Sequence, residues 1–138
     1  MRKGKRFPFV KRTNSANLAN TMPYLPIALT YGDTTIEAMA LLDTGASVNV
    51  LPYEEGLRLG ATWSEQNVPI QLGGNLAREE ARGIVLSTTI DDFPSVSLAF
   101  AWTRSKQVPV ILGHTNFFEE FDVCFYRADS AFEICPKE

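Results

Sequence analysis

The sequence predicts a single, mostly β domain with two short helices. The chain has 138 residues, the usual length of one domain, and its 45% hydrophobic and 21% charged content is ordinary for a globular protein. Short alternating or apolar runs recur between Gly, Pro and Asp turn signals, which is typical of β-strands. Helix signals occur after Pro52 and after Thr115. A chain of this length can bury a core without disulfide bonds.

The first 22 residues predict a basic, flexible tail, followed by a domain at residues 23–138. Six of the 13 Lys and Arg residues, and none of the 16 acidic residues, lie in residues 1–12, so the remainder carries a formal charge of −9. Such a tail is either a solvated terminus or a contact for nucleic acid or an anionic membrane. Phe7, Phe9 and Val10 could pack part of it against the domain.

Targeting and membrane-spanning segments are not expected. No apolar stretch approaches the roughly 20 residues that cross a bilayer. The basic start also lacks the apolar stretch that follows it in a secretory signal. We therefore expect a cytoplasmic protein.

The first predicted hairpin delivers a carboxylate to the end of a buried strand. Residues 24–31 alternate, Pro26 favours an outer position, and residues 34–42 form the return strand. Asp43 follows the apolar end of that strand, where a charged residue seldom lies without a partner or a task. Gly45 then allows a tight turn or the close approach of another backbone.

The middle of the chain predicts a short strand, a helix and a hairpin. Residues 48–51 are apolar, and the next segment is a helix that begins at Pro52 and stops at Gly60. We expect Leu57 and Leu59 to be its packing residues.

Residues 68–90 predict a hairpin with an exposed tip at residues 72–77. Val68, Ile70 and Leu72 alternate before the glycines of the tip, and an apolar run follows. By its turn residues alone, this segment is an ordinary polar hairpin. The next predicted strand ends near Trp102.

The end of the chain predicts a buried strand, a short helix and a second hairpin. Residues 108–112 form a continuous apolar run, and Thr115 or Asn116 caps the helix. If the last turn is symmetric about residues 129 and 130, Cys124 faces Cys135. A disulfide bond is then sterically conceivable, but reduced thiols are expected without a secretory signal.

Two motifs carry a resemblance to a known family. The segment Ala40-Leu41-Leu42-Asp43-Thr44-Gly45-Ala46-Ser47 resembles the active-site motif of the aspartic proteases, and the chain length and single copy resemble the retropepsins. The segment Val108-Pro109-Val110-Ile111-Leu112-Gly113-His114 is similar to the family's downstream hydrophobic-hydrophobic-Gly segment. The resemblance covers roughly residues 24–135 and implies a closed, barrel-like fold with one lobe per chain.

The resemblance also implies roles for individual residues. Asp43 is the catalytic residue, and the active-site turn continues through Thr44, Gly45 and Ala46. The tip at residues 72–77 matches the flap that covers bound peptide, and Trp102 matches the groove wall, although a role as a core anchor is at least as well supported. The substrate-binding and second-loop residues are then Leu72, Gly73, Gly74, Asn75, Leu76, Trp102, Ile111, Leu112 and Gly113.

Two positions depart from the family's pattern. His114 stands where the family usually has an arginine, and Ser47 is the position that this arginine would fix, so the family's ion pair is not expected here. A structural role is favoured for His114. Ala46 in place of serine removes a hydroxyl near the active site, which is compatible with activity nearer neutral pH.

The implied function is that of an aspartic endopeptidase acting on peptide or protein substrates. Its chemistry needs two carboxylates that share one proton, and the chain has a single Asp-Thr-Gly, so we expect a homodimer with one Asp43 from each copy. No cofactor or metal is expected, because one histidine cannot make a zinc site. By the same resemblance, the terminal hairpin is a candidate for the dimer interface, and the basic tail could be an arm that the protease itself removes.

Two other functional classes stay open. One is a catalytically weak, dimeric peptide-binding or scaffolding module of the same fold. The other is a nucleic-acid binder that uses the basic tail, which is the weakest alternative because no nucleic-acid-binding motif is visible.

Overall fold

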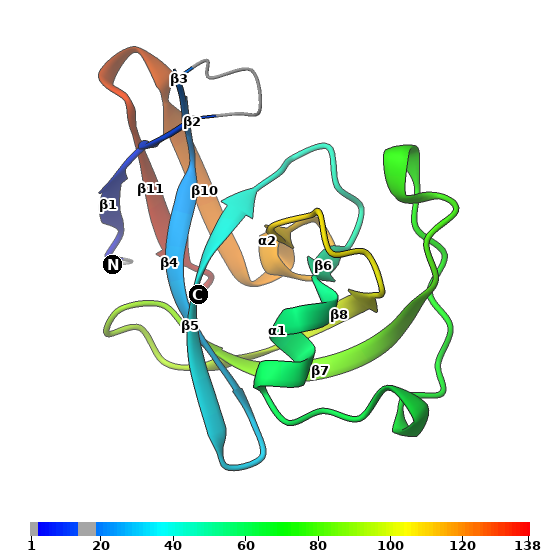
Figure 1. The fold of residues 1–138 in the computed structure, drawn as a ribbon. Coiled ribbons are helices and arrows are strands. Elements are labelled where there is room, and N and C mark those ends of the chain that lie inside the picture. Colours follow the sequence, from blue (N-terminus) through cyan, green and yellow to red (C-terminus); the bar gives the residue numbers. More distant parts are fainter. Residues whose placement is uncertain (1–2, 14–18) are drawn as a thin grey trace.

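Six strands close into a barrel in the computed structural model, which describes residues 3–13 and 19–138 (Figure 1). Predictions for residues 1–2 and 14–18 lie outside the described residues. The barrel order is β4-β5-β9-β6-β8-β7. Its strands are β4 (Tyr24–Tyr31), β5 (Thr34–Leu42), β6 (Asn49–Leu51), β7 (Ala81–Thr89), β8 (Val96–Thr103) and β9 (Val110–Leu112). The mostly β, closed-barrel prediction is therefore confirmed.

The β4–β5 hairpin forms as predicted and carries Asp43 to the end of β5. Tyr31 pairs with Thr34 across a turn in which Gly32 has a φ of +59°, a value that favours glycine. β5 also pairs in parallel with β9, so that Leu42 lies beside Leu112. The two predicted apolar runs therefore end side by side at one edge of the barrel.

Two short helices and two 3₁₀ turns complete the barrel. Helix α1 (Tyr53–Arg58) is followed by Gly60 at a φ of +79°, as the stop signal predicted. Leu59 is buried as expected, but Leu57 is exposed on the outer side of the helix. The other helical segments beside the barrel are the 3₁₀ turns η1 (Trp63–Glu65) and η2 (Gly74–Leu76), and helix α2 (Phe117–Glu120).

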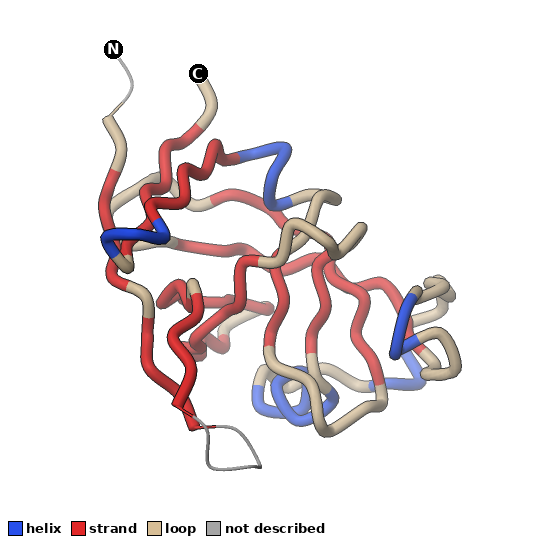
Figure 2. Tube along the Cα trace, turned by 90° about the horizontal axis from the view of Figure 1, so that it is seen from above, coloured by secondary structure: helices blue, strands red, loops and turns tan. Residues whose placement is uncertain are grey.

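Part of the segment expected to be a flexible tail forms strands instead. Strand β1 (Lys5–Pro8) pairs with β11 (Ala131–Pro136), which also pairs with β10 (Phe121–Tyr126). β2 (Val10–Thr13) and β3 (Ala19–Met22) form a separate hairpin. In Figures 1 and 2, this terminal sheet and the segment around η2 lie on opposite sides of the barrel.

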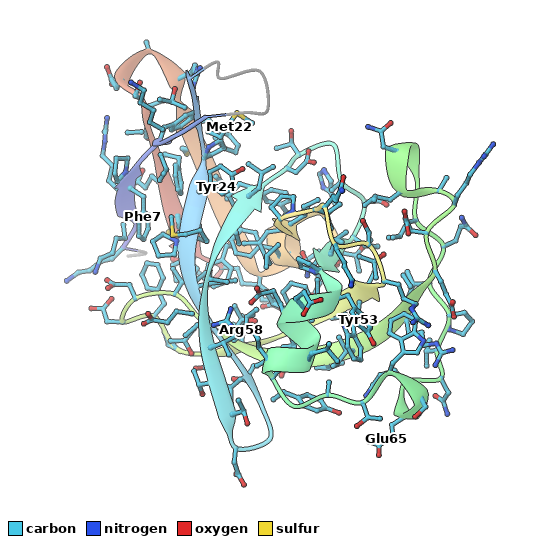
Figure 3. The ribbon with its side chains drawn as sticks, in the orientation of Figure 1. Phe7, Met22, Tyr24, Tyr53, Arg58 and Glu65 are labelled. Atoms are coloured by element: carbon cyan, nitrogen blue, oxygen red, sulfur yellow. The ribbon has the colours of Figure 1, made fainter. Side chains whose placement is uncertain are left out.

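Aromatic packing explains why the N-terminal segment is ordered. The ring of Phe7 stacks on that of Phe132 at 5.6 Å, and Phe9 meets the same ring edge-on at 5.9 Å. Phe7 lies on the inner side of β1 (Figure 3), and Phe132 is fully buried. The sequence left this packing of Phe7 and Phe9 open as a possibility. The packing orders a segment whose basic composition predicted a flexible tail.

The register of the terminal hairpin differs from the prediction. Cys124 pairs with Glu133, and Cys135 pairs with Asp122, so the two cysteines do not face each other. The cause is the 3₁₀ turn η3 (Arg127–Asp129), which moves the centre of the turn one residue earlier than expected and ends with Ser130 in the left-handed region. Both thiols are free.

Phe7→Ala tests whether β1 belongs to the fold. We expect the free energy of unfolding to fall by about 1–3 kcal/mol, less than for a fully buried phenylalanine, because the partly exposed ring loses its stack on Phe132. Denaturant titration measures this loss. Val85→Ala, at a residue that is 61% exposed, is the control and should cost about 0.5 kcal/mol or less. Equal midpoints for Phe7→Ala and wild type would show that β1 adds nothing to stability.

Candidate active site

Asp43 lies on a turn that the backbone fixes from both sides. Its amide donates to the carbonyl of Leu112 at 3.0 Å, and its own carbonyl accepts from the Ala46 amide at 3.1 Å. The Gly45 amide donates to Asp43 Oδ1 at 2.9 Å. The side chain is partly exposed, so the carboxylate is held in one orientation while water and substrate can reach it.

The loop after β9 is packed against this turn. The amides of His114 and Thr115 donate to the carbonyls of Ala46 and Ser47, at 3.0 and 2.9 Å. A Cβ on Gly113 would lie 2.6 Å from the Ala46 carbonyl oxygen, so only glycine fits there. The two motifs of the sequence, residues 43–46 and residues 111–113, therefore meet in space.

His114 contacts the turn through its side chain as well. Its Nε2 lies 2.8 Å from the carbonyl oxygen of Thr44, and its ring packs beside that of Phe118 at 5.2 Å. The histidine thus bonds to Thr44, whereas Ser47, the position expected from the resemblance, is held by the Thr115 backbone.

A pair of side-chain amides, the buried Asn49 and the partly exposed Asn116, supports this arrangement and was not predicted from the sequence. Asn49 is fully buried, accepts from the Gly113 amide at 2.8 Å and donates to the Ala99 carbonyl at 3.0 Å. Asn116 accepts from the Ala99 amide at 3.0 Å and from Asn49 Nδ2 at 3.3 Å. The sequence did contain a sign of Asn49's role, because Asn49 is a polar residue inside an apolar run and a buried amide needs hydrogen-bond partners.

A groove of about 620 Å³ opens in front of Asp43. The predicted tip residues lie across it from the turn. The lining consists of Asp43, Gly45, Ala46, Ser47, Val48, Val50, Leu72, Gly73, Gly74, Asn75, Leu76, Glu79, Ser105, Gln107, Val108 and Ile111. Three of the predicted site residues do not line the groove: Thr44 belongs to the turn itself, and Leu112 and Gly113 lie behind it. The groove therefore combines the Asp43 and Glu79 carboxylates with walls that are partly apolar and partly polar.

The segment over the groove is not the regular hairpin that alternation predicted. Its first arm meets β7 at an isolated bridge between Pro69 and Arg82, where the Ile70 amide donates to the Ala81 carbonyl at 3.0 Å and the Gly83 amide donates to the Val68 carbonyl at 2.8 Å. The tip is the 3₁₀ turn η2, and Gln71 Nε2 closes it by donating to the carbonyls of Leu72 and Ala77 at 3.0 and 3.1 Å. Leu72 is buried in the apolar cluster beneath.

Trp102 does not line the groove, so its interpretation as a groove wall is wrong. Its side chain is fully buried, its Nε1 donates to the Tyr53 carbonyl at 3.1 Å, and its ring stacks on that of Tyr53 at 5.7 Å. Gly56 leaves room for the indole where any side chain would collide with it. Trp102 is therefore the core anchor that joins α1 to β8.

The described residues contain neither a metal-binding cluster nor a membrane-spanning helix. Within residues 3–13 and 19–138, no group of three or more His, Cys, Asp and Glu side chains could hold a metal ion. Across the same residues, no helix is long and apolar enough to span a bilayer.

The barrel and its Asp43 turn define a retropepsin-like fold. Similar solved structures include a retropepsin-like aspartic protease from Rickettsia conorii, with a TM-score of 0.59, 16% identity, and coverage of 99% of this chain and 96% of that chain. The retroviral protease-like domain of Ddi1 from Leishmania major has a TM-score of 0.54, 16% identity, and coverage of 73% and 79%. EIAV protease complexed with the inhibitor HBY-793 has a TM-score of 0.51, 20% identity, and coverage of 71% and 86%.

The family assignment comes from the sequence. A family model for aspartyl proteases matches residues 27–115, a segment that contains both the Asp43 turn and the loop at Gly113. The chain therefore belongs to the aspartyl protease family. No curated protein sequence matches it.

Asn49→Ala tests the pair of side-chain amides. We expect a loss of about 2–3 kcal/mol in the free energy of unfolding, because the Gly113 amide and the Asn116 side chain lose a buried partner. Thermal or denaturant unfolding measures it, with Asn67→Ala at an exposed position as the matched control. A loss no larger than that of the control would mean that the pair does not support the turn.

Proposed function

We propose that the protein is an aspartic endopeptidase that works as a homodimer. The observation that carries this proposal is Asp43, which is partly exposed, fixed by backbone hydrogen bonds and placed in a groove beneath the segment at residues 72–77. A carboxylate held in this way, with partly apolar walls beside it, suits a peptide backbone that must be bound before it is cleaved.

The chemistry needs a second carboxylate. One carboxylate must be ionised to take a proton from water, while the other must be protonated to donate to the scissile carbonyl. Two close carboxyl groups share one proton, because both cannot ionise at that distance. Water then attacks the carbonyl carbon, and the resulting tetrahedral species breaks down as the amide nitrogen receives a proton and leaves.

The second carboxylate is supplied by a second copy. The sequence has one Asp-Thr-Gly; Asp33 lies in an exposed turn, and Asp33-Thr34 is followed by Thr35 of β5 rather than by glycine. A symmetric dimer brings Asp43 of each copy to the two-fold axis. The exposed side chain of Thr44 is then available to the partner's turn, and residues 72–77 act as the flap.

The terminal sheet is the surface that we assign to the dimer contact. β10 pairs only with β11 among the described strands, so its other edge is open. Phe125 and Tyr126 on this strand are 40% and 36% exposed. The Tyr126 hydroxyl donates to Glu133, and this bond, with the nearby Cys124, raises the pKa of Tyr126. An open edge with aromatic side chains favours pairing with another copy.

Asp43→Asn tests the catalytic assignment. We expect peptide-library cleavage to fall by at least roughly 10²–10⁴-fold, because the amide cannot exchange the proton that the mechanism requires. The fold should be retained, because the amide oxygen can still accept from Gly45. Asp33→Asn is the matched control, since it removes the exposed Asp-Thr carboxylate of the same chain. A pepstatin-type inhibitor should block wild-type cleavage.

The same experiment also distinguishes the endopeptidase from a catalytically weak binding or scaffolding module of the same fold. Equal cleavage by wild type and Asp43→Asn would overturn the assignment of Asp43. An absence of cleavage by wild type, with peptide binding that Asp43→Asn leaves intact, would instead support a binding or scaffolding module.

A mixing experiment tests the dimer. When wild type and Asp43→Asn are mixed in equal amounts and allowed to exchange subunits, the activity per wild-type chain should fall to roughly half, because hybrid dimers carry one Asp43. The same mixture assayed before exchange is the control. Activity per wild-type chain that never changes would mean that one chain contains the whole catalytic site.

A further inference from the structure

We propose that His114 is a positioning residue that sets the orientation of the Thr44–Gly45 peptide, and through it the hydrogen bond to the Asp43 carboxylate. The inference rests on the proposed function for its catalytic consequence, while its structural part holds for the turn itself. Its basis is a continuous chain of hydrogen bonds from the imidazole ring to Asp43.

The first step in this chain is the histidine. Its Nε2 lies 2.8 Å from the Thr44 carbonyl oxygen. A carbonyl oxygen only accepts hydrogen bonds, so Nε2 must carry the proton, either in the neutral Nε2–H tautomer or in the imidazolium. The ring of Phe118 packs against the imidazole at a centroid distance of 5.2 Å, with the two ring planes tilted by 55°.

The second step is the peptide bond itself. The Thr44 carbonyl and the Gly45 amide belong to one planar unit and point in opposite directions. The carbonyl end is bonded to His114, and the amide end donates to Asp43 Oδ1 at 2.9 Å. Fixing the carbonyl therefore aims the amide at the carboxylate, and bonds arranged in series polarise one another.

No other contact of the described residues does this. The backbone bonds that join the turn to the loop at residues 112–115 use the Asp43 amide and the carbonyls of Ala46 and Ser47. These bonds hold the ends of the turn but make no contact with the Thr44–Gly45 peptide. Without His114, this peptide would be held only by the bond from its amide to Asp43, and glycine at position 45 would tolerate a flipped orientation.

Two substitutions at His114 separate its hydrogen bond from its packing. His114→Phe keeps a ring beside Phe118 but has no donor. His114→Gln places an amide nitrogen the same number of bonds from the Cα as Nε2, so it restores the donor without the ring. His114 is exposed, and substitutions at exposed positions seldom unfold a protein.

Nuclear magnetic resonance gives a test that does not depend on activity. His114 is the only histidine in the chain, so its ring ¹⁵N signals are unambiguous. We expect a protonated Nε2, and we expect the Gly45 amide proton to move upfield in His114→Phe and to return toward its wild-type position in His114→Gln. A neutral ring with the proton on Nδ1, or a Gly45 signal that neither variant moves, would overturn the proposal.

Kinetics test the catalytic consequence. His114→Phe should lower kcat by about 3- to 10-fold with little change in KM, the effect of one partly exposed hydrogen bond, and His114→Gln should recover most of the loss. An unchanged kcat in His114→Phe, or equal losses in both variants, would contradict the positioning role. If wild type cleaves no peptide while the Gly45 signal responds as expected, the proposed function fails and the structural inference stands.

Discussion

The close approach of Gly113 to the Asp43 turn is the contact on which the rest of the site depends. Parallel pairing of β5 with β9 brings two apolar strands to the same edge of the barrel, and a residue without a side chain lets their following loops touch. Backbone hydrogen bonds then lock the two loops together. The carboxylate is held by a rigid backbone, which is what a reacting group with a fixed geometry requires.

The rest of the barrel supports this contact from beneath. Asn49 and Asn116 tie β6, β8 and the loop before α2 into one hydrogen-bonded network around the buried Asn49, and its polar atoms are satisfied by one another and by the backbone. The aromatic cluster around Trp102 secures α1 on the other side. The Asp43 turn is thus supported by a polar network on one side and by the apolar core on the other.

Local signals identified the barrel strands, both helices and the Asp43 turn, because apolar alternation and glycine act over a few residues. The resemblance supplied the closed, barrel-like architecture with one lobe per chain. What failed depended on distant packing: Phe7 is ordered by Phe132, and Trp102 is a core residue because Gly56 admits its indole. The register of the terminal hairpin depends on a 3₁₀ turn that no residue pattern predicted. The bond from His114 to Thr44 likewise joins residues that are 70 positions apart.

The central claim is that two Asp43 carboxylates, one from each of two copies, form a single active site. The stoichiometry of a pepstatin-type inhibitor tests it most directly, because an inhibitor of this kind occupies the whole dyad. Isothermal titration should give one inhibitor for every two chains, and Asp43→Asn should bind it far more weakly. One inhibitor per chain, or equal binding by Asp43→Asn, would contradict a shared active site.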